Sequence, residues 1–280
     1  MRGIATSRKA TFALYGSLTV MSIVWLVPMF TALMISLLPL RQSQHGWWNF
    51  SPQQLTLRSY ANAWHQGLSS YTVNSLIIAV LAVGLTVTLG TLAAYAFARL
   101  PFRAKGILYF LLITTMIVPV QIILIPLLPW FETLHLNSGA WQFFGIALVH
   151  TAFGAGWAVF MLGTFFRDIP EELLEAARVD GAGTLSTFRR VALPLAVPGV
   201  VSFAIIDFVF VWNDLLLGLT LLDKAHRPLT VGLANLQAPH LNQNDLISAG
   251  SMIAILPPLL LFAALNRVYV RGLFAGSVKG

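Results

Sequence analysis

Residues 167–194 read RDIPEELLEAARVDGAGTLSTFRRVALP and form the longest charged interval in a chain that is otherwise mostly apolar. The interval holds five of the ten acidic residues. Asp168 is a candidate N-cap for a first helix, with Glu171 three residues later as the acid of a capping box. Gly181 and Gly183 should end this helix, because glycine tolerates the left-handed conformation found after many helices. One side of the helix is expected to carry Leu173, Ala176, Ala177 and Asp180.

A second short helix is expected after the two glycines. Thr184 is its candidate N-cap, and Leu185, Phe188 and Ala192 recur on one face at helical spacing. Pro194 should end the helix, because proline lacks a backbone N–H and its ring clashes with the preceding turn. The whole interval is therefore predicted to form a helix-turn-helix.

The composition indicates an integral membrane protein. The 280 residues are 57% hydrophobic and 10% charged, with a mean hydropathy of +0.78. Average globular chains carry about 25% charged residues. Cysteine is absent, so no function of this chain depends on a disulfide or a thiolate metal site. We expect an all-α membrane protein with a single transmembrane domain, residues 1–280.

Six intervals are long and apolar enough to cross a bilayer, which takes about 20 residues. They are residues 11–38, 71–98, 106–131, 140–165, 195–221 and 247–266. The first follows Arg2, Arg8 and Lys9, as a secretory signal would. It is too long for a signal sequence, and no Ala-x-Ala-like cleavage site follows closely. We therefore expect a permanent span there.

Prolines and small residues modify these spans. Pro119 and Pro126 in the third span, and Pro257 and Pro258 in the sixth, predict kinks. Small residues, which let membrane helices approach closely, are grouped in the second and fourth spans. These are Gly84, Thr88, Gly90, Gly154, Gly156 and Ala158. They predict a tight bundle or a subunit contact.

The basic residues predict the orientation. Six spans put both termini on one side, and if that side is the cytosol, thirteen basic residues face the cytosol and four face outward. The outer four are Arg41, Arg58, Lys224 and Arg227. This bias predicts cytosolic N- and C-termini and a cytosolic 167–194 segment. It also explains the net charge of +7 without nucleic acid.

The 167–194 segment contains a motif with fixed spacing. Its positions are Glu175, Ala176, Ala177, Gly181, Val191, Leu193 and Pro194. Three residues separate Ala177 from Gly181, and nine separate Gly181 from Val191. This pattern resembles the EAA loop of membrane subunits of ABC-type importers. Asp180 belongs to the same part of the segment.

Softer similarities run over nearly the whole chain. They are Asn74-Ser75-Leu76, the run from Ala94 to Arg99, Trp212-Asn213-Asp214, and the tail from Arg271 to Gly280. They resemble the carbohydrate-uptake branch of these importers, which includes the smaller membrane subunit of the maltose transporter. That branch more often has glutamate at the position of Asp214.

The resemblance implies a six-helix type I ABC importer permease fold with a cytosolic coupling helix-turn-helix, in a bacterial-type cytoplasmic (inner) membrane. It also implies the partners: a second, related permease subunit in a heterodimer, two ATP-binding subunits, an extracytoplasmic solute-binding protein and membrane lipid. ATP and Mg would be bound by the ATP-binding subunits, since this chain has no GxxxxGK[ST] loop. We expect no cofactor or metal on this chain. Glu175 would meet a basic residue of the ATPase, Ala176 and Ala177 would allow close packing, and Gly181 would set the angle between the two helices.

A few polar residues lie within the predicted spans. Asp207 is near the middle of the fifth span, with Phe210, Asn213 and Asp214 beyond it, and His150 is in the fourth. Helical spacing puts both acids on one face with two aromatic rings: Phe203, Asp207, Phe210 and Asp214. A charge at the bilayer centre costs at least ~2.5 kcal/mol, so such residues usually face a cavity or a partner. They either line a sugar pathway or form structural contacts, such as a pair between His150 and Asp207. The sequence leaves both interpretations open.

Other functions fit less well. An intramembrane protease would need a nucleophile or acid motif, and neither Gly-x-Gly-Asp nor Gly-x-Ser-Gly occurs. An ion-coupled secondary carrier could use Asp207 as a relay, but it has no use for a loop that docks another protein. An ABC importer for another small solute remains the alternative to a sugar importer.

Overall fold

The computed structural model describes residues 8–46, 48, 51–237 and 243–277. Arg2 and the last three residues of the tail from Arg271 to Gly280 lie outside this range. Within it every regular element is a helix and no strand occurs, which confirms the predicted fold class. The chain divides into two compact units, one formed by Met1–Leu68 with Leu233–Ile255 and the other by Ser69–Gly232 with Leu256–Gly280.

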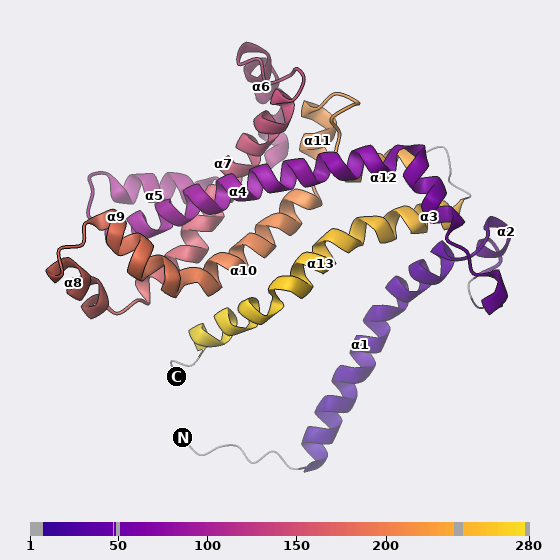
Figure 1. The fold of residues 1–280 in the computed structure, drawn as a ribbon, viewed down its shortest axis with the longest axis horizontal. Coiled ribbons are helices and arrows are strands. Elements are labelled where there is room, and N and C mark those ends of the chain that lie inside the picture. The colour runs from indigo at the N-terminus through magenta and orange to yellow at the C-terminus, as the bar shows by residue number, and fades with distance from the viewer. Residues whose placement is uncertain (1–7, 47, 49–50, 238–242, 278–280) are drawn as a thin grey trace. The chain divides into compact units, whose positions relative to one another are not determined.

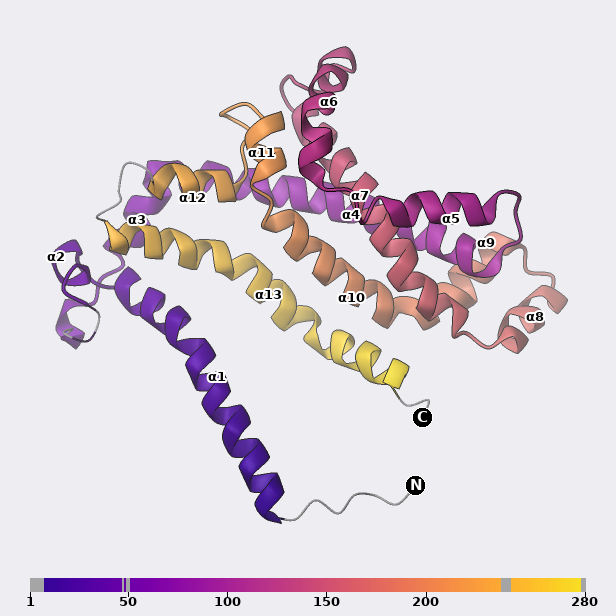
Figure 2. The same ribbon diagram turned by 180° about the vertical axis from the view of Figure 1, so that it is seen from behind.

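The helices are labelled in Figure 1 and seen from behind in Figure 2. They are α1 (Arg8–Ser36), α2 (Leu40–Ser43), η2 (Pro52–Gln54), α3 (Arg58–Ala63), η3 (Trp64–Leu68), α4 (Ser69–Arg99), α5 (Lys105–Thr114), α6 (Val120–Thr133), α7 (Trp141–Arg167), α8 (Glu171–Val179), α9 (Thr184–Thr187), η4 (Phe188–Ala192), α10 (Leu193–Trp212), α11 (Leu216–Leu221), α12 (Leu229–Gln237) and α13 (Asn244–Ser277). Among the described residues, five helical stretches are long and apolar enough to cross a membrane. They are Ala10–Ser36, Pro52–Arg99, Trp141–Arg167, Thr184–Trp212 and Asn244–Asn266.

The third predicted span, residues 106–131, is not a single helix. It is divided into α5 and α6, each shorter than a bilayer requires. Pro119 precedes α6 in an extended conformation, because its ring fixes φ and removes the N–H that a continuous helix would need. The amides of residues 115–118 instead bond to Leu112, Ile113 and Thr114 at 3.0–3.3 Å. The break therefore leaves these backbone donors paired, as a non-helical segment at membrane depth requires.

The fifth predicted span, residues 195–221, is also interrupted. Helix α10 ends at Trp212, and α11 begins at Leu216. The Asn213 side chain donates a hydrogen bond back to the Val209 carbonyl at 2.9 Å, and the Asp214 carboxylate accepts from the Gly218 amide at 3.0 Å. Short polar side chains that bond the nearby backbone in this way compete with helix continuation.

Helix α7 is the centre of the second unit, packed against α4 and α10. Its small residues account for the close approach, as predicted. A Cβ on Gly154 would meet Thr86 of α4 and Asp207 of α10, and Gly90 of α4 faces Ala158. Gly84 does not take part, because a Cβ there would meet no atom within 4 Å.

The break between α5 and α6 packs on α7 at Gly156. A Cβ on this glycine would lie 2.5 Å from the Leu112 carbonyl oxygen and 2.7 Å from Thr115 Oγ1. Only a residue without a side chain allows the interrupted backbone to rest on α7 here.

The first unit is held by three polar contacts. Ser36 Oγ and Tyr60 Oη are 2.7 Å apart, Ser59 Oγ donates to Asp245 Oδ2 at 2.7 Å, and the Thr56 amide donates to the Leu37 carbonyl at 2.8 Å. The large apolar side chains of α1 from Phe12 to Leu33 are exposed. Helix α13 runs continuously through Pro257 and Pro258.

Candidate functional site: residues 167–194 and the polar groups of α7 and α10

The first helix of the 167–194 segment is α8, and it ends as the sequence predicts. Gly181 follows it with a φ of 83°, and the Ala182 amide bonds the Ala177 carbonyl at 2.9 Å. This left-handed glycine closes the C-terminus of α8 and turns the chain toward α9. A residue with a side chain would be strained at this φ.

The start of α8 differs from the prediction. Asp168 lies at the C-cap of α7, and the extended Pro170 precedes α8, so the expected capping box does not form. The Glu171 carboxylate is held away from the backbone, because it pairs with Arg99 Nη1 at 2.7 Å and with Arg178 Nη1 at 3.2 Å. These charge-assisted contacts are stronger than a bond to one backbone amide.

The second helix also differs. Gly183 occupies the N-cap position, and Thr184 is the first residue of α9. Pro194 does not end the helix, because the chain continues through the wide turn η4 into α10. In this turn the Leu193 amide bonds the Phe188 carbonyl, five residues back. The widened turn relieves the clash that the Pro194 ring would cause in a regular α-helix.

One buried leucine attaches α8 to the bundle. Leu174 is 0% exposed and lies in a cluster with Ile169 and Phe188. The ring of Phe188 lies 5.1 Å from that of Tyr95 on α4 and 6.2 Å from that of Phe166 on α7. The segment is therefore seated on the ends of both α4 and α7.

Other side chains of the 167–194 segment are exposed to solvent. Val179 is 87% exposed, and Leu173 and Leu185 are also exposed, although all three are apolar. Of the predicted coupling residues, Ala177, Val191 and Leu193 are half-buried and the others are exposed: Glu175, Ala176, Asp180, Gly181 and Pro194. These exposed apolar side chains are available to an interaction partner.

The polar residues within the bundle do not form the predicted pair. His150 Nε2 lies 3.9 Å from Asp214 Oδ2, not beside Asp207. Asp207 is buried next to Thr86, and its Oδ2 has no hydrogen-bond partner among the described residues. Gly154, one turn after His150 on α7, is the residue that packs against Asp207, and His150 therefore lies beside the acid beyond the end of α10.

The residues of the expected face, with its two acids and two aromatic rings, are not equally exposed. Phe203 is 2% exposed and belongs to the core, whereas Phe210 is 67% exposed. Asn213 is exposed as well, and Asp214 is half-buried. Phe210 and Asn213 are thus exposed, whereas Asp214 lies 3.9 Å from the buried His150 and Asp207 is itself buried.

Known proteins identify the family. Residues 86–274 match the family described as binding-protein-dependent transport system inner membrane component. The chain belongs to this family.

Two relatives and one solved structure support this. The permease is 35% identical over 287 residues to the osmoprotective compounds uptake permease protein GgtD of Synechocystis sp., with 98% of this chain and 95% of that protein covered. It is 34% identical over 259 residues to the trehalose transport system permease protein SugB of Mycobacterium tuberculosis, with 91% and 93% covered. A chain of a bacterial ABC transporter that imports the acidic polysaccharide alginate superposes with a TM-score of 0.78 at 19% identity, over 95% of this chain and 99% of that one. This likeness confirms the predicted ABC importer permease fold.

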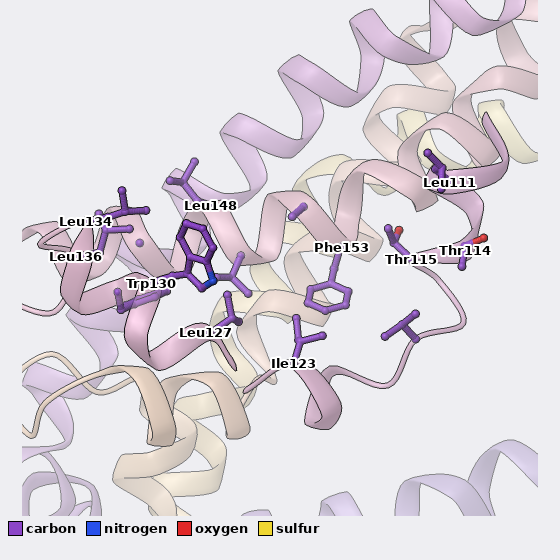
Figure 3. Close-up of a pocket in the computed structure, with 15 residues that line it drawn as sticks. Leu111, Thr114, Thr115, Ile123, Leu127, Trp130, Leu134, Leu136, Leu148 and Phe153 are labelled. Carbon is purple, nitrogen blue, oxygen red and sulfur yellow. The ribbon is translucent and has the colours of Figure 1, made fainter. Parts of the chain in front are cut away.

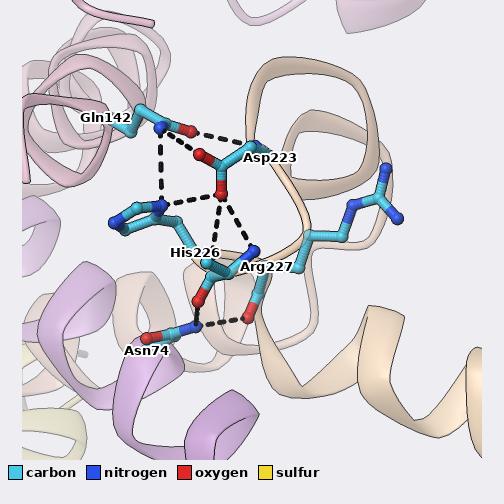
Figure 4. A network of polar contacts seen from close by, with 6 residues as sticks. Asn74, Gln142, Asp223, His226 and Arg227 are labelled. Carbon is cyan, nitrogen blue, oxygen red and sulfur yellow. Dashed lines mark hydrogen bonds and ion pairs between the residues drawn. The ribbon is translucent and has the colours of Figure 1, made fainter. Parts of the chain in front are cut away.

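A polar network holds one end of the permease bundle (Figure 4). The Gln142 amide at the start of α7 donates to Asp223 Oδ2 at 2.8 Å, and Asp223 Oδ1 lies 2.7 Å from His226 Nδ1. Asn74 Nδ2 of α4 donates to the carbonyls of Ala225 and Arg227 at 2.8 and 3.0 Å. The hydrogen bonds from Gln142 and His226 lower the pKa of Asp223 to about 2. The network connects the loop after α11 to α4 and α7. Asn74 of the Asn74-Ser75-Leu76 stretch therefore has a structural role.

The permease also has an apolar cavity of about 500 Å³ among α5, α6 and α7 (Figure 3). It is lined by Leu111, Thr114, Thr115, Val118, Ile123, Leu127, Trp130, Phe131, Leu134, Leu136, Gly145, Leu148, Val149, Ala152 and Phe153. The Thr114 and Thr115 hydroxyls donate to carbonyls of their own helix, at 2.8 and 2.7 Å. The cavity therefore suits hydrocarbon and offers little to a polyhydroxylated solute.

Sequence reasoning missed the residues that hold the 167–194 segment in place. Leu174 shares its helix with the more exposed Leu173, and periodicity over nine residues did not separate the two. The sequence predicts a capping role for Glu171. It marks Arg99 only as the end of the Ala94–Arg99 similarity and as one of the basic residues on the predicted cytosolic side. A basic residue that closes a span is a weak signal, because the orientation rule alone explains it.

Proposed function

We propose that this permease is one of two related membrane subunits of an ATP-driven sugar importer. Its 167–194 segment docks on an ATP-binding subunit. The observation that carries the proposal is the open surface of that segment, where the motif residues Glu175 and Ala176 lie among exposed apolar side chains. Such a surface in a transport subunit calls for a protein partner.

The assembly would contain two permeases in a heterodimer, two ATP-binding subunits that hold ATP and Mg, and an extracytoplasmic solute-binding protein. The basic residues support cytosolic termini, since thirteen of seventeen fall on the side of the 167–194 segment. This segment, which contains α8, is seated on the ends of α4 and α7. Closure of the ATPase pair would therefore reorient the bundle between two states.

The pathway lining is inferred from exposure. We place Phe210 and Asn213 on the pathway, because they are the aromatic and polar groups of α10 and its end that remain exposed, with the half-buried Asp214 beside them. An aromatic ring and polar side chains suit the flat face and hydroxyls of a sugar. His150 and Asp207 lie inside the bundle and support it.

A sugar is favoured as solute by the likeness to SugB, a trehalose transport permease, and to the alginate importer. The name of GgtD, which refers to osmoprotective compounds, keeps another small solute as the second candidate.

The test is to purify the full-length chain from its native membranes and identify the proteins that copurify. We expect an ATP-binding subunit, a second permease and ATP hydrolysis that one saccharide, presented with the solute-binding protein, stimulates. Uptake by the purified chain alone, driven by an ion gradient, would instead identify a secondary carrier. Stimulation by a solute that is not a sugar would select the second candidate.

A further inference from the structure

Arg99 is the last residue of α4, and its guanidinium group bonds the turn between α7 and α8. Nε donates to the Phe166 carbonyl at 2.8 Å, and Nη2 donates to the Arg167 carbonyl at 3.0 Å and to that of Ile169. Nη1 pairs with Glu171 Oε2 at 2.7 Å. The Arg99 side chain is 13% exposed: its contacts with the Phe166 and Ile169 carbonyls are partly buried, and those with Arg167 and Glu171 lie at the surface.

The chemistry of this site fits arginine and no other residue. The last carbonyls of a helix have no partner within the helix and carry a partial negative charge. The planar guanidinium offers five N–H donors in a fixed fork, so one side chain can serve several carbonyls and a carboxylate together. A lysine ammonium could reach Glu171, but it could not span the same set of carbonyls.

The carboxylate of Glu171 extends the contact into α8. Its Oε1 accepts from Arg178 Nη1 at 3.2 Å, while Oε2 binds Arg99. One acid at the start of α8 thus links the end of α4 to the last turn of α8. Tyr95, one turn earlier on α4, supplies the apolar part of the same support, because its ring lies 5.5 Å from that of Phe166.

We propose that Arg99 is a positioning residue that fixes the 167–194 segment to α4. A displacement of α8 then moves α4 together with α7, to which the segment is joined through the backbone. The consequence for coupling rests on the proposed function; the attachment itself does not. Without Arg99, α8 would keep its buried Leu174 but lose the polar link to α4.

A spin label tests the attachment directly. The chain has no cysteine, so Val179→Cys provides a single labelling site at an exposed position at the end of α8. In the full-length permease in lipid nanodiscs, we expect Arg99→Ala to convert the immobilised spectral component into a mobile one. Arg99→Lys and Glu171→Gln should give intermediate spectra, because each keeps part of the network. Arg103→Ala, which removes an exposed positive charge four residues further on, should leave the spectrum unchanged.

The two possible failures are distinct. An unchanged spectrum in Arg99→Ala, or an equal change in Arg103→Ala, overturns the positioning role whatever the ATPase assays give. If the role holds and the segment couples to an ATPase, Arg99→Ala in the copurified assembly lowers solute transported per ATP hydrolysed, and Arg99→Lys restores part of it. Absence of any ATPase from the assembly of the unsubstituted chain would refute the proposed function and leave the spin-label result standing.

Discussion

The Oδ1 atom of Asp207 lies 3.1 Å from the position that a Cβ on Gly154 would occupy. Thr86 Cγ2 lies 2.6 Å from the same point. Three helices, α4, α7 and α10, therefore meet where α7 has no side chain. The Thr86 hydroxyl donates to the Ala82 carbonyl of its own helix at 2.8 Å, so it stays paired at this junction. Asp207 is held by close packing more than by a full set of hydrogen bonds.

Gly154→Ala should therefore destabilise the bundle. The added methyl group must push α4 or α10 away from α7, and overpacking of a tight core costs about 1–3 kcal/mol. We expect a lower thermal unfolding midpoint for the detergent-solubilised chain. Gly84→Ala is the matched control, because a Cβ at Gly84 meets no atom and alanine favours a helix interior by about 0.5–1 kcal/mol over glycine. A midpoint for Gly154→Ala at or above that of Gly84→Ala would contradict the packing argument.

The sequence predicts those parts of the fold that depend on local chemistry. Hydropathy locates the long helices, and the left-handed Gly181 follows from glycine's conformational freedom. The predictions of helix starts and ends are wrong where a residue distant in sequence, or a local change of the helix, overrides the capping and proline rules. The capping box fails because Arg99, far away in sequence, takes the Glu171 carboxylate. Pro194 fails to end a helix because a widened turn accommodates it.

In the candidate site, too, local features can be predicted from the sequence and contacts between distant residues cannot. The motif residues of the 167–194 segment can be found from spacing alone, since the spacing is the signal. Which acid faces His150 depends on how α7 is aligned with α10, because Gly154 packs against Asp207 and His150 lies beside Asp214. The sequence of neither helix contains that alignment. The exposure of Phe210 and the burial of Phe203 depend on which neighbours surround α10, and the sequence of α10 alone does not contain that information.

Phe210 and Phe203 should respond oppositely to truncation. Phe203 packs in the core, so Phe203→Ala should cost about 3–5 kcal/mol of stability and lower the amount of folded protein in the membrane. Phe210 has little packing within the chain, so Phe210→Ala should leave the unfolding midpoint nearly unchanged while solute uptake falls. The measurement is uptake at matched membrane abundance, alongside thermal unfolding. Normal uptake in Phe210→Ala would remove this residue from the pathway.

The loop after α11 should weaken in acid. Because the folded-state pKa of Asp223 is about 2, below the ordinary value, its carboxylate stabilises the loop above pH ~4, and this contribution is lost as the pH falls from about 4 to 2. No change from this group is expected between pH 5 and 8. Hydrogen exchange of residues 222–228, corrected for the intrinsic pH dependence, measures the effect.

Gln142→Leu sharpens this prediction, since the Gln142 hydrogen bond is the largest cause of the lowered pKa. In this variant the acid-induced opening of the loop should begin at a higher pH. Glu132→Gln removes an exposed carboxylate outside the network and should leave the transition in place. A transition at the same pH in Gln142→Leu and in the unsubstituted chain would show that Asp223 is not held by this bond.

Charge reversal at Glu175 and a side chain at Gly181 should uncouple transport from ATP hydrolysis without removing the permease from the membrane. Glu175 is exposed on α8, so Glu175→Lys leaves the bundle intact and presents the wrong charge to a basic partner residue. Gly181→Val forces a β-branched residue into a φ of 83° and changes the angle between α8 and α9. Gly183→Ala is the matched control, because its φ is −69° and a Cβ there meets no atom. We expect solute-stimulated ATP hydrolysis and uptake to fall in the first two variants and to persist in the control. Unchanged uptake in both Glu175→Lys and Gly181→Val, at equal membrane abundance, would mean that the exposed face of α8 does not transmit the ATPase movement.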